Sequence, residues 1–363
     1  MTGISGFTVV LMPSLALFAG LQLSGIGLDR AFGFAGGVLA IGTFGVTQYQ
    51  SRRPPTRRIV FLAKSRSSFA RNIYRGLVEG LAPYGDIHVS GAFPEHDDDP
   101  RAFQIDRLRS LEIARADGLV IIPATDDTDV WQSLARSMRR GTTVVCLDTK
   151  PPNQHFLQYG TLAPHFVGSD FSVGGRIVGR YLIERLEQSP DAQLLVALGP
   201  SSSWPARERS SWILYEVAAA GLLSRCHVVE LPDWTPTIGA ARLLATIEGV
   251  ADGCGALYVF AGNDKLAVEL DRQLDRSSRT PTGVEVRLVG YDGTTTDDGE
   301  HVLVARDRAI ATIDALPLAQ GKAAAEFIEW AYEGQPIDVR KRIVDPRLIQ
   351  FDGVASSVAL LSE

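Results

Sequence analysis

From Arg57 onward, short runs of β-branched and other apolar residues alternate with amphipathic stretches. The first run, RIVFLA, precedes SFARNIYRGLVEGLA, and the same alternation continues through IHVSGAF, GLVIIPA and TTVVCLD. A second series begins at HFVGSD (165–170) and continues through QLLVALG, HVVELPDW, LYVFAGND and VRLVGYDG. Strands that alternate with helices run parallel and are joined by right-handed crossovers. The sequence therefore predicts an α/β protein with two Rossmann-like lobes, each built on a parallel sheet.

Several of the expected strands end abruptly in a carboxylate or an amide. Asp148 ends TTVVCLD, Asn263 and Asp264 end VFAGND, and Asp292 ends LVGYD. In open α/β sheets, ligands bind outside the carboxyl ends of the strands. These residues are therefore expected to line a polar pocket.

Residues 1–50 differ from the rest of the chain, since they contain only two charged side chains, Asp29 and Arg30. The segments 4–24 and 31–48 are each long and apolar enough to cross a bilayer as a helix. We interpret residues 1–50 as a transmembrane hairpin that anchors the chain in the lipid bilayer through residues 4–48. A processed export signal is the alternative, but MTGISGF lacks the basic start of such signals.

A basic linker, SRRPPTRR (51–58), follows the expected hairpin. Short basic loops next to membrane helices remain in the cytoplasm. This rule places the rest of the chain on the cytoplasmic face of the cytoplasmic (inner) membrane.

The composition excludes several classes of function. The net charge is −6, from 36 basic and 42 acidic residues, so the chain has no electrostatic footprint for nucleic acid. Cys146, Cys226 and Cys254 show no metal or redox spacing and are read as buried thiols. The sequence contains no GxSxG, HExxH or Walker motif, and nothing in it predicts a cofactor, a metal site or an enzyme.

The order and separation of these strings resemble the type I periplasmic sugar-binding proteins, the ribose-binding and LacI-like group, from about Arg57 to about Leu348. The resemblance implies two lobes joined by three crossovers, just after Asp148, near Ala315 and near Asp345. The first lobe would comprise residues 57–150 and about 316–344. The second would comprise 151–315 and about 345–350, with 351–363 as a C-terminal tail. A small sugar or polyol would be held in the cleft as the lobes close.

Carried onto this sequence, the family's pocket positions fall at six residues. Phe69 and Trp234 would stack on the faces of the ligand, whereas Asp148, Arg207, Asn263 and Asp292 would bind its hydroxyl groups. Simpler roles remain open. Asn263 could only cap a helix, Asp292 could only form a turn, Arg207 could be solvated, and either aromatic ring could belong to the core. Asp148 and Asp292 could also be a catalytic pair of carboxylates, although hydroxyl binding is the preferred reading.

The sequence also departs from the ribose-binding pattern. Ser67, Ala70, Thr149 and Ala315 stand where that pattern has an asparagine, a second aromatic residue, an arginine and a glutamine. These shorter side chains predict a roomier, less charged pocket and argue against ribose itself.

The preferred function is a membrane-anchored solute-binding protein for carbohydrate or polyol, either the substrate-binding component of an ABC transporter or a sugar sensor. Its partner would be an ABC permease or a membrane signalling protein. The family analogy places the binding domain in the cell envelope or periplasm, against the positive-inside rule. The alternative is a ligand-free regulatory or scaffold module of a membrane complex.

Overall fold

The computed structural model describes residues 56–351, apart from 96–98, 125–127, 278–282, 297–298 and 336–340. The predicted hairpin, residues 51–55 of the basic linker and the tail after Phe351 lie outside the described residues. No helix in the described ranges is long and apolar enough to span a membrane. The chain from Arg57 onward forms one compact unit.

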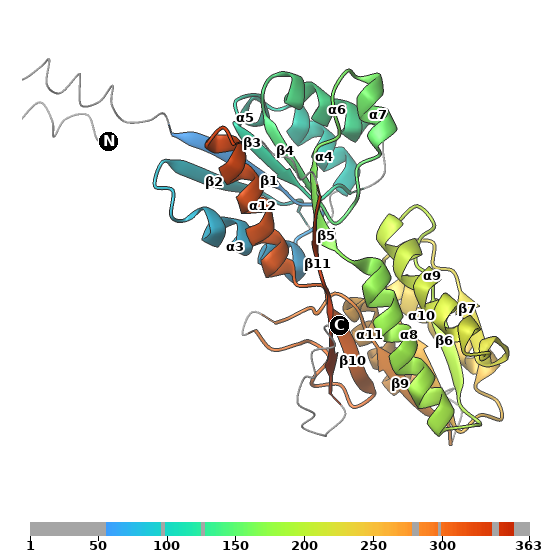
Figure 1. Cartoon of the computed structure of the whole chain (residues 1–363). Helices are drawn as coiled ribbons and strands as arrows, with labels where there is room; N and C mark the ends of the chain where they lie inside the picture. Colours follow the sequence, from blue (N-terminus) through green and yellow to red (C-terminus); the bar gives the residue numbers. More distant parts are fainter. Residues whose placement is uncertain are drawn as a thin grey trace, which may run out of the picture. The chain divides into compact units, whose positions relative to one another are not determined.

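The first lobe is built on a parallel six-stranded sheet in the order β11-β5-β4-β3-β1-β2 (Figure 1). Its strands are β1 (Arg57–Leu62), β2 (Ile87–Ala92), β3 (Gly118–Ile121), β4 (Thr143–Leu147), β5 (His165–Ser169) and β11 (Lys341–Val344). Helices α3 (Ser68–Leu81) and α12 (Pro317–Tyr332) pack on one face. Helices α4 (Pro100–Arg109), α5 (Leu111–Ala114), α6 (Thr128–Arg139) and α7 (Asn153–Gln158) belong to the other face.

The second lobe contains a six-stranded sheet in the order β12-β10-β9-β8-β6-β7. Its strands are β6 (Gln193–Ala197), β7 (Cys226–Val229), β8 (Ala256–Phe260), β9 (Glu285–Val289), β10 (Ala309–Asp314) and β12 (Arg347–Gln350), which runs antiparallel to β10. Helices α8 (Phe171–Gln188) and α9 (Trp204–Ala219) cover one face. Helices α10 (Pro236–Val250) and α11 (Asp264–Arg276) cover the other, and a 3₁₀ turn, η1 (Leu223–Arg225), precedes β7.

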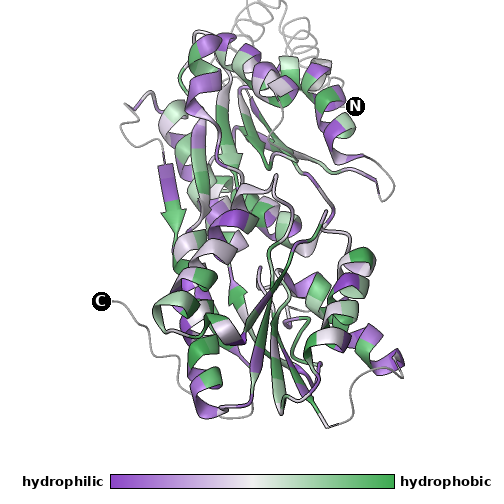
Figure 2. Ribbon diagram, turned by 90° about the vertical axis from the view of Figure 1, so that its right-hand side faces the viewer, coloured by the Kyte–Doolittle hydropathy of each residue, from purple (hydrophilic) through white to green (hydrophobic). Residues whose placement is uncertain are grey.

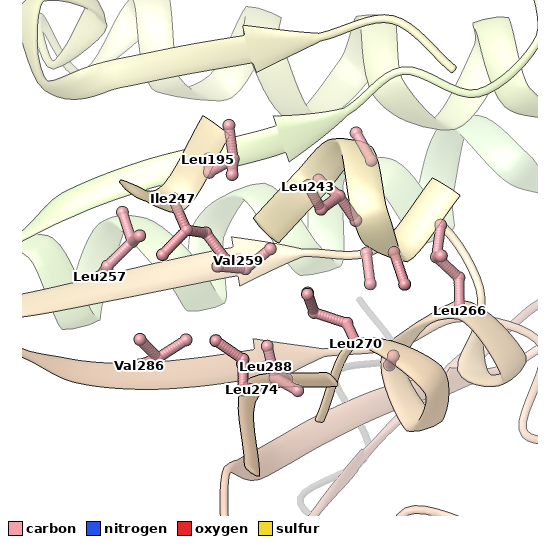
Figure 3. Packing of buried hydrophobic residues seen from close by; sticks show 14 of the residues in the cluster. Leu195, Leu243, Ile247, Leu257, Val259, Leu266, Leu270, Leu274, Val286 and Leu288 are labelled. Carbon is pink, nitrogen blue, oxygen red and sulfur yellow. The ribbon is translucent and has the colours of Figure 1, made fainter. Parts of the chain in front are cut away.

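Both sheets are buried on two faces, which explains their nearly continuous apolar strands. In β1, Ile59 and Phe61 enter one core, whereas Val60 and Leu62 enter the other. This alternation is the two-residue period of a strand. Figure 2 shows the strands of both sheets mostly as hydrophobic, and Figure 3 shows side chains of β8 and β9 packed against α10 and α11.

The chain passes between the lobes three times, and the first passage differs from the prediction. The second and third passages lie between β10 and α12 and between β11 and β12. The first lies between β5 and α8, not just after Asp148, because β5 pairs with β4 in the first sheet through Cys146 and Phe166. The predicted boundary at residues 150/151 is therefore wrong. The short helix α7 returns the chain to the sheet that it has just left.

Candidate functional site

Two oppositely charged pairs, one from each lobe, lie at the carboxyl ends of the strands. Lys64 and Asp148 follow β1 and β4 in the first lobe, whereas Arg209 on α9 and Asp292 after β9 belong to the second. The charges of Lys64 and Asp148 both influence the pKa of Asp292. The two pairs therefore belong to one electrostatic cluster at the junction of the lobes.

In the first pair, Lys64 Nζ lies 2.5 Å from Asp148 Oδ2. The Asp148 side chain is 10% exposed, whereas that of Lys64 is 34% exposed. Asp148 has a φ of 64°, in the left-handed region that a residue with a Cβ rarely adopts. Its backbone N–H donates to the Val167 carbonyl at 3.1 Å, which ties this turn to β5. The fold thus fixes the carboxylate just beyond the end of β4.

In the second pair, Arg209 Nη1 lies 3.5 Å from Asp292 Oδ1. Arg209 is 5% exposed, and its guanidinium carbon lies 4.9 Å from the centroid of the Trp234 ring and 4.8 Å from that of Tyr291. These distances allow cation–π attraction on both rings. Arg209 Nε is buried and has no hydrogen-bond partner in the described structure. The two rings therefore hold the Arg209 guanidinium in place, and its Nε–H remains available to donate a hydrogen bond.

The local charges shift the pKa of Asp292. Burial raises this pKa to about 6, with Arg209 opposing the rise and the charge of Asp148 adding to it. The backbone φ is 105°, and the N–H donates to the Ile313 carbonyl at 2.9 Å. Asp292 is thus a carboxylate held at a fixed position by β10, in an environment that disfavours its charge.

Asp264 holds the segment that carries Asp292. Its backbone N–H donates to the Tyr291 carbonyl at 2.8 Å, and the Thr294 N–H donates to its Oδ2 at 2.6 Å. The Thr312 hydroxyl donates to its Oδ1 at 2.5 Å. Burial raises the pKa of Asp264 well above its usual range. Through these hydrogen bonds Asp264 fixes the segment that carries Asp292.

Of the two predicted aromatic residues, Phe69 is half-buried and packs on the cores of both lobes. Trp234 packs on the backbone of Gly199 and Gly262, where an added Cβ would lie 2.4 Å and 2.9 Å from the indole ring. Both glycines have positive φ, so the close approach and the backbone conformation each favour glycine. The indole ring of Trp234 is thus held in place, and it contacts the cluster through the guanidinium of Arg209.

Asn263 occupies the N-cap of α11, where its Oδ1 accepts from the Leu266 N–H at 2.8 Å. This is the capping role that the sequence left open. The bond uses only the amide oxygen, so the two N–H donors of the same half-buried side chain can serve another acceptor.

Arg207 does not belong to the cluster. Its side chain is exposed, and Nη1 donates to the Ser201 carbonyl. Residues two apart on a helix point about 200° away from each other, so Arg207 and Arg209 cannot face the same site. In the structure, the arginine that faces Asp292 is Arg209 and not Arg207.

The sequence analysis missed Lys64 and Tyr291 as members of the cluster. Lys64 follows RIVFLA, so the same polar strand-end signal that identified Asp148 was present there. Tyr291 lies inside GYDG. Its buried hydroxyl packs against Gly174, where an added Cβ would lie 2.1 Å from the hydroxyl oxygen. Within the described ranges, no group of three or more His, Cys, Asp or Glu side chains could hold a metal ion.

No protein-family model matches the sequence. The chain is 26% identical over 245 residues to a D-ribose/D-allose-binding protein of Pseudomonas aeruginosa, covering 66% of this chain and 72% of that protein. A periplasmic solute-binding protein of an ABC transporter from Actinobacillus succinogenes, solved with D-allose, matches with a TM-score of 0.65 and 17% identity, covering 82% of this chain and 98% of the other. A solute-binding protein from Bacillus halodurans, solved with myo-inositol, matches with a TM-score of 0.62 and 15% identity, covering 82% and 96%.

The described chain therefore has the fold of the type I periplasmic sugar-binding proteins, as the resemblance implied. Each of these similar proteins is named as a sugar-binding or solute-binding protein and not for a reaction, in agreement with the prediction of a binder rather than an enzyme.

Proposed function

We propose that this chain binds a small carbohydrate or polyol between its two lobes, as the substrate-binding component of an ABC transporter. The observation that carries the proposal is the meeting of the Lys64–Asp148 pair with the Arg209–Asp292 pair from the opposite lobe. The relatives named for D-ribose or D-allose and solved with D-allose or myo-inositol support this ligand class.

The cluster has the chemistry that a hydroxylated ring needs. Carboxylate oxygens accept hydrogen bonds from hydroxyl groups, and ammonium and guanidinium groups donate to hydroxyl oxygens. Phe69 and Trp234 offer apolar ring faces to the C–H surfaces of such a ring. The donor of Arg209 that is buried without a partner favours a ligand that brings an acceptor, because an unmet buried donor costs free energy.

A ligand that contacts both pairs would couple binding to the angle between the lobes. Binding shifts a conformational equilibrium by as much as the ligand prefers one state over the other. A closed state that brings both pairs onto the ligand would therefore be favoured by occupancy, as in other hinge-closing binding proteins.

The two neighbouring arginines of α9 provide a matched test. We expect Arg209→Ala to weaken the binding of D-allose, D-ribose or myo-inositol by about 100-fold, because it removes a buried charged donor. Arg207→Ala, at an exposed position two residues away, should change the affinity less than about twofold. Isothermal titration of the purified full chain gives both values. Equal effects of the two substitutions on the ligands that bind would contradict the proposal.

We further propose that residues 4–48 anchor the chain in the cytoplasmic membrane, with the binding domain on the envelope side and an ABC permease as its partner. The relatives named as periplasmic support this side, against the arginines of residues 51–58. Protease added to intact spheroplasts should therefore digest the binding domain. Protection of the domain until the membrane is broken would instead place it in the cytoplasm.

A further inference from the structure

Both carboxylates of the cluster already face a cation. Asp148 accepts from Lys64 at 2.5 Å, and Asp292 lies 3.5 Å from Arg209. Both cations also keep unused donors. An ammonium group has three N–H bonds and a guanidinium group has five, and Arg209 Nε is buried without a partner in the described structure. Arg209 Nε is therefore a buried cationic donor that no described protein group satisfies, and Lys64 keeps N–H groups beyond the one that donates to Asp148.

Most of the charges that act on Asp292 are positive. Its pKa responds to three cations, Lys64, Arg209 and Lys265, the last of which is an exposed residue in the first turn of α11. Asp148 is the carboxylate that opposes them beside Asp292 itself. Three cations and one carboxylate are thus the charges that act most on Asp292.

Two neighbouring aspartates, Asp264 and Asp170, are engaged by hydrogen bonds outside the two pairs. Both carboxylate oxygens of Asp264 accept hydrogen bonds from Thr312 and Thr294, and burial raises the pKa of Asp264 well above its usual range. Asp170 is engaged at the N-cap of α8, where one oxygen accepts from the backbone of Ser172 and Val173 and from the Ser172 hydroxyl. Although burial opposes the change, these hydrogen bonds lower the pKa of Asp170, so Asp170 keeps its negative charge, and Lys341 is the cation that acts on it. Neither aspartate bonds to Lys64 or Arg209 in the described structure, so the free N–H groups of these two cations remain open to a ligand.

We propose that the ligand is a polyhydroxylated monoanion, a sugar acid rather than a neutral sugar, and that Lys64 is the residue that selects its carboxylate. This inference rests on the proposed function and names the ligand class of that same site. The ligand carboxylate would accept charge-assisted hydrogen bonds from Lys64 and Arg209, and its hydroxyl groups would donate to Asp148 and Asp292. The buried Arg209 Nε would then have an acceptor.

The position of Lys64 suits this role. Its side chain is 34% exposed, and its one hydrogen bond in the described structure goes to Asp148. Lys64 can therefore turn toward a ligand without opening a cavity in the core. A purely structural Lys64 would hold Asp148 in place and would affect neutral and acidic ligands alike. A selecting Lys64 would affect the acid more than the neutral sugar. The ratio of the two affinities therefore separates the roles.

The experiment is an isothermal titration of the purified full chain with matched ligands, D-allose with D-allonate and D-ribose with D-ribonate. We expect each acid to bind at least about tenfold more tightly than its neutral sugar, because it adds a charge-assisted contact. Lys64→Met should make the affinities for the acid and its neutral sugar equal, whereas Lys64→Arg should retain most of the preference for the acid. Lys322→Met, which removes an exposed ion pair with Glu79 on the α3–α12 surface, is the control and should leave the ratio unchanged.

Three outcomes would overturn this inference and leave the proposed function standing. They are equal affinities for the acid and the neutral sugar of each pair, tighter binding of the neutral sugars, and a preference for the acids that persists in Lys64→Met. Allose 6-phosphate tests the source of the negative charge. Tighter binding of the phosphate than of either acid would also overturn the assignment of a carboxylate. Failure of every sugar, acid and phosphate to bind would overturn the proposed function as well. Thermal unfolding of each unliganded variant identifies any that fail to fold, in which case Lys64→Arg and Lys64→Gln supply the ratio.

Discussion

Asp148 and Asp292 share an uncommon backbone conformation at the residue scale. Both follow a buried strand, and their φ angles are 64° and 105°. Such conformations cost about 1–3 kcal/mol each in residues with a Cβ, and they persist where the surrounding structure holds them. Here the hydrogen bonds to Val167 and Ile313 do so. The strain lies at the two carboxylates of the cluster, where a functional site is expected.

Replacing Asp292 tests its raised pKa. Because the pKa in the folded chain is about 6, above the ordinary 3.8, the folded state binds the proton more tightly than the unfolded state. Ionisation of Asp292 therefore lowers stability as the pH rises from about 4 to above 6, by at most roughly 3 kcal/mol for a fully buried group. The Asp292 side chain is 33% exposed, so we expect Asp292→Asn to stabilise the unliganded chain by about 1 kcal/mol near pH 7.5 and by almost nothing near pH 4.

Urea unfolding of both proteins at the two pH values measures this difference. Asp252→Asn, at an exposed loop position, is the control and should show no such dependence on pH. A stabilisation by Asp292→Asn that is the same at both pH values would show that the effect does not come from its titration.

The residues of the cluster could be predicted in part. Asp148 and Asp292 stood out because a polar residue that ends a buried strand must lie at the sheet edge. The choice between Arg207 and Arg209 could not be made, because it depends on the rotation of α9 about its axis, which packing in the second lobe determines. Lys64 carries the same strand-end signal, but its pairing with Asp148, which lies 84 positions away, could not be predicted from the sequence.

At the scale of elements, the contact between α3 and α12 joins distant parts of the chain. A Cβ on Gly76 would lie 2.1 Å from the Leu318 carbonyl oxygen, and one on Gly321 would lie 2.1 Å from the Ile73 carbonyl oxygen. The two helices thus meet backbone to backbone, and Figure 1 shows them side by side. Through this contact α12 belongs to the first lobe, although every element of the second lobe except β12 precedes it in the chain.

A pair of glycine substitutions tests that contact. Gly76→Ala should destabilise the chain by about 2–4 kcal/mol, because the new methyl group overlaps a carbonyl oxygen and forces the helices apart. Gly249→Ala lies in α10 with nothing within 4 Å of the added Cβ, and it should stabilise the chain by about 0.5–1 kcal/mol through helix propensity. Chemical unfolding gives both values. Equal effects of the two substitutions would contradict the close contact.

The elements themselves were largely predictable, but their assignment to sheets was less so. Strands of the type RIVFLA must be buried on both faces, and their alternation with helices requires parallel sheets. The pattern does not say which sheet a strand joins. β5 was therefore assigned to the wrong lobe, and the antiparallel direction of β12 had no signal in its four residues.

At the scale of the whole molecule, a few side chains join the two lobes. Asn72 Nδ2 on α3 lies 3.4 Å from Thr295 Oγ1 in the second lobe. Trp204 at the start of α9 packs on Phe166 of β5 and on Phe171 of α8, with ring centroids 6.1 Å and 5.6 Å apart. Phe69 also contacts both cores. These contacts are few compared with the cores inside each lobe, so a change in the angle between the lobes would leave each lobe intact.

A ligand that contacts both charged pairs should therefore change the distance between the lobes but not distances within a lobe. Spin labels on Leu157→Cys and Leu223→Cys, at exposed positions in the first and second lobes, would report the first distance, and Leu223→Cys with Ile238→Cys would report the second. Labelling near neutral pH should be selective, because burial raises the pKa of Cys146, Cys226 and Cys254 above that of a free thiol. We expect the ligand to shift the distance between the lobes and to narrow its distribution, while the distance within the second lobe stays unchanged. In Arg209→Ala the same shift should need about 100-fold more ligand. A shift of the distance within the second lobe, or a shift between the lobes that needs no more ligand in Arg209→Ala, would show that the change is not driven by ligand contacts at this cluster.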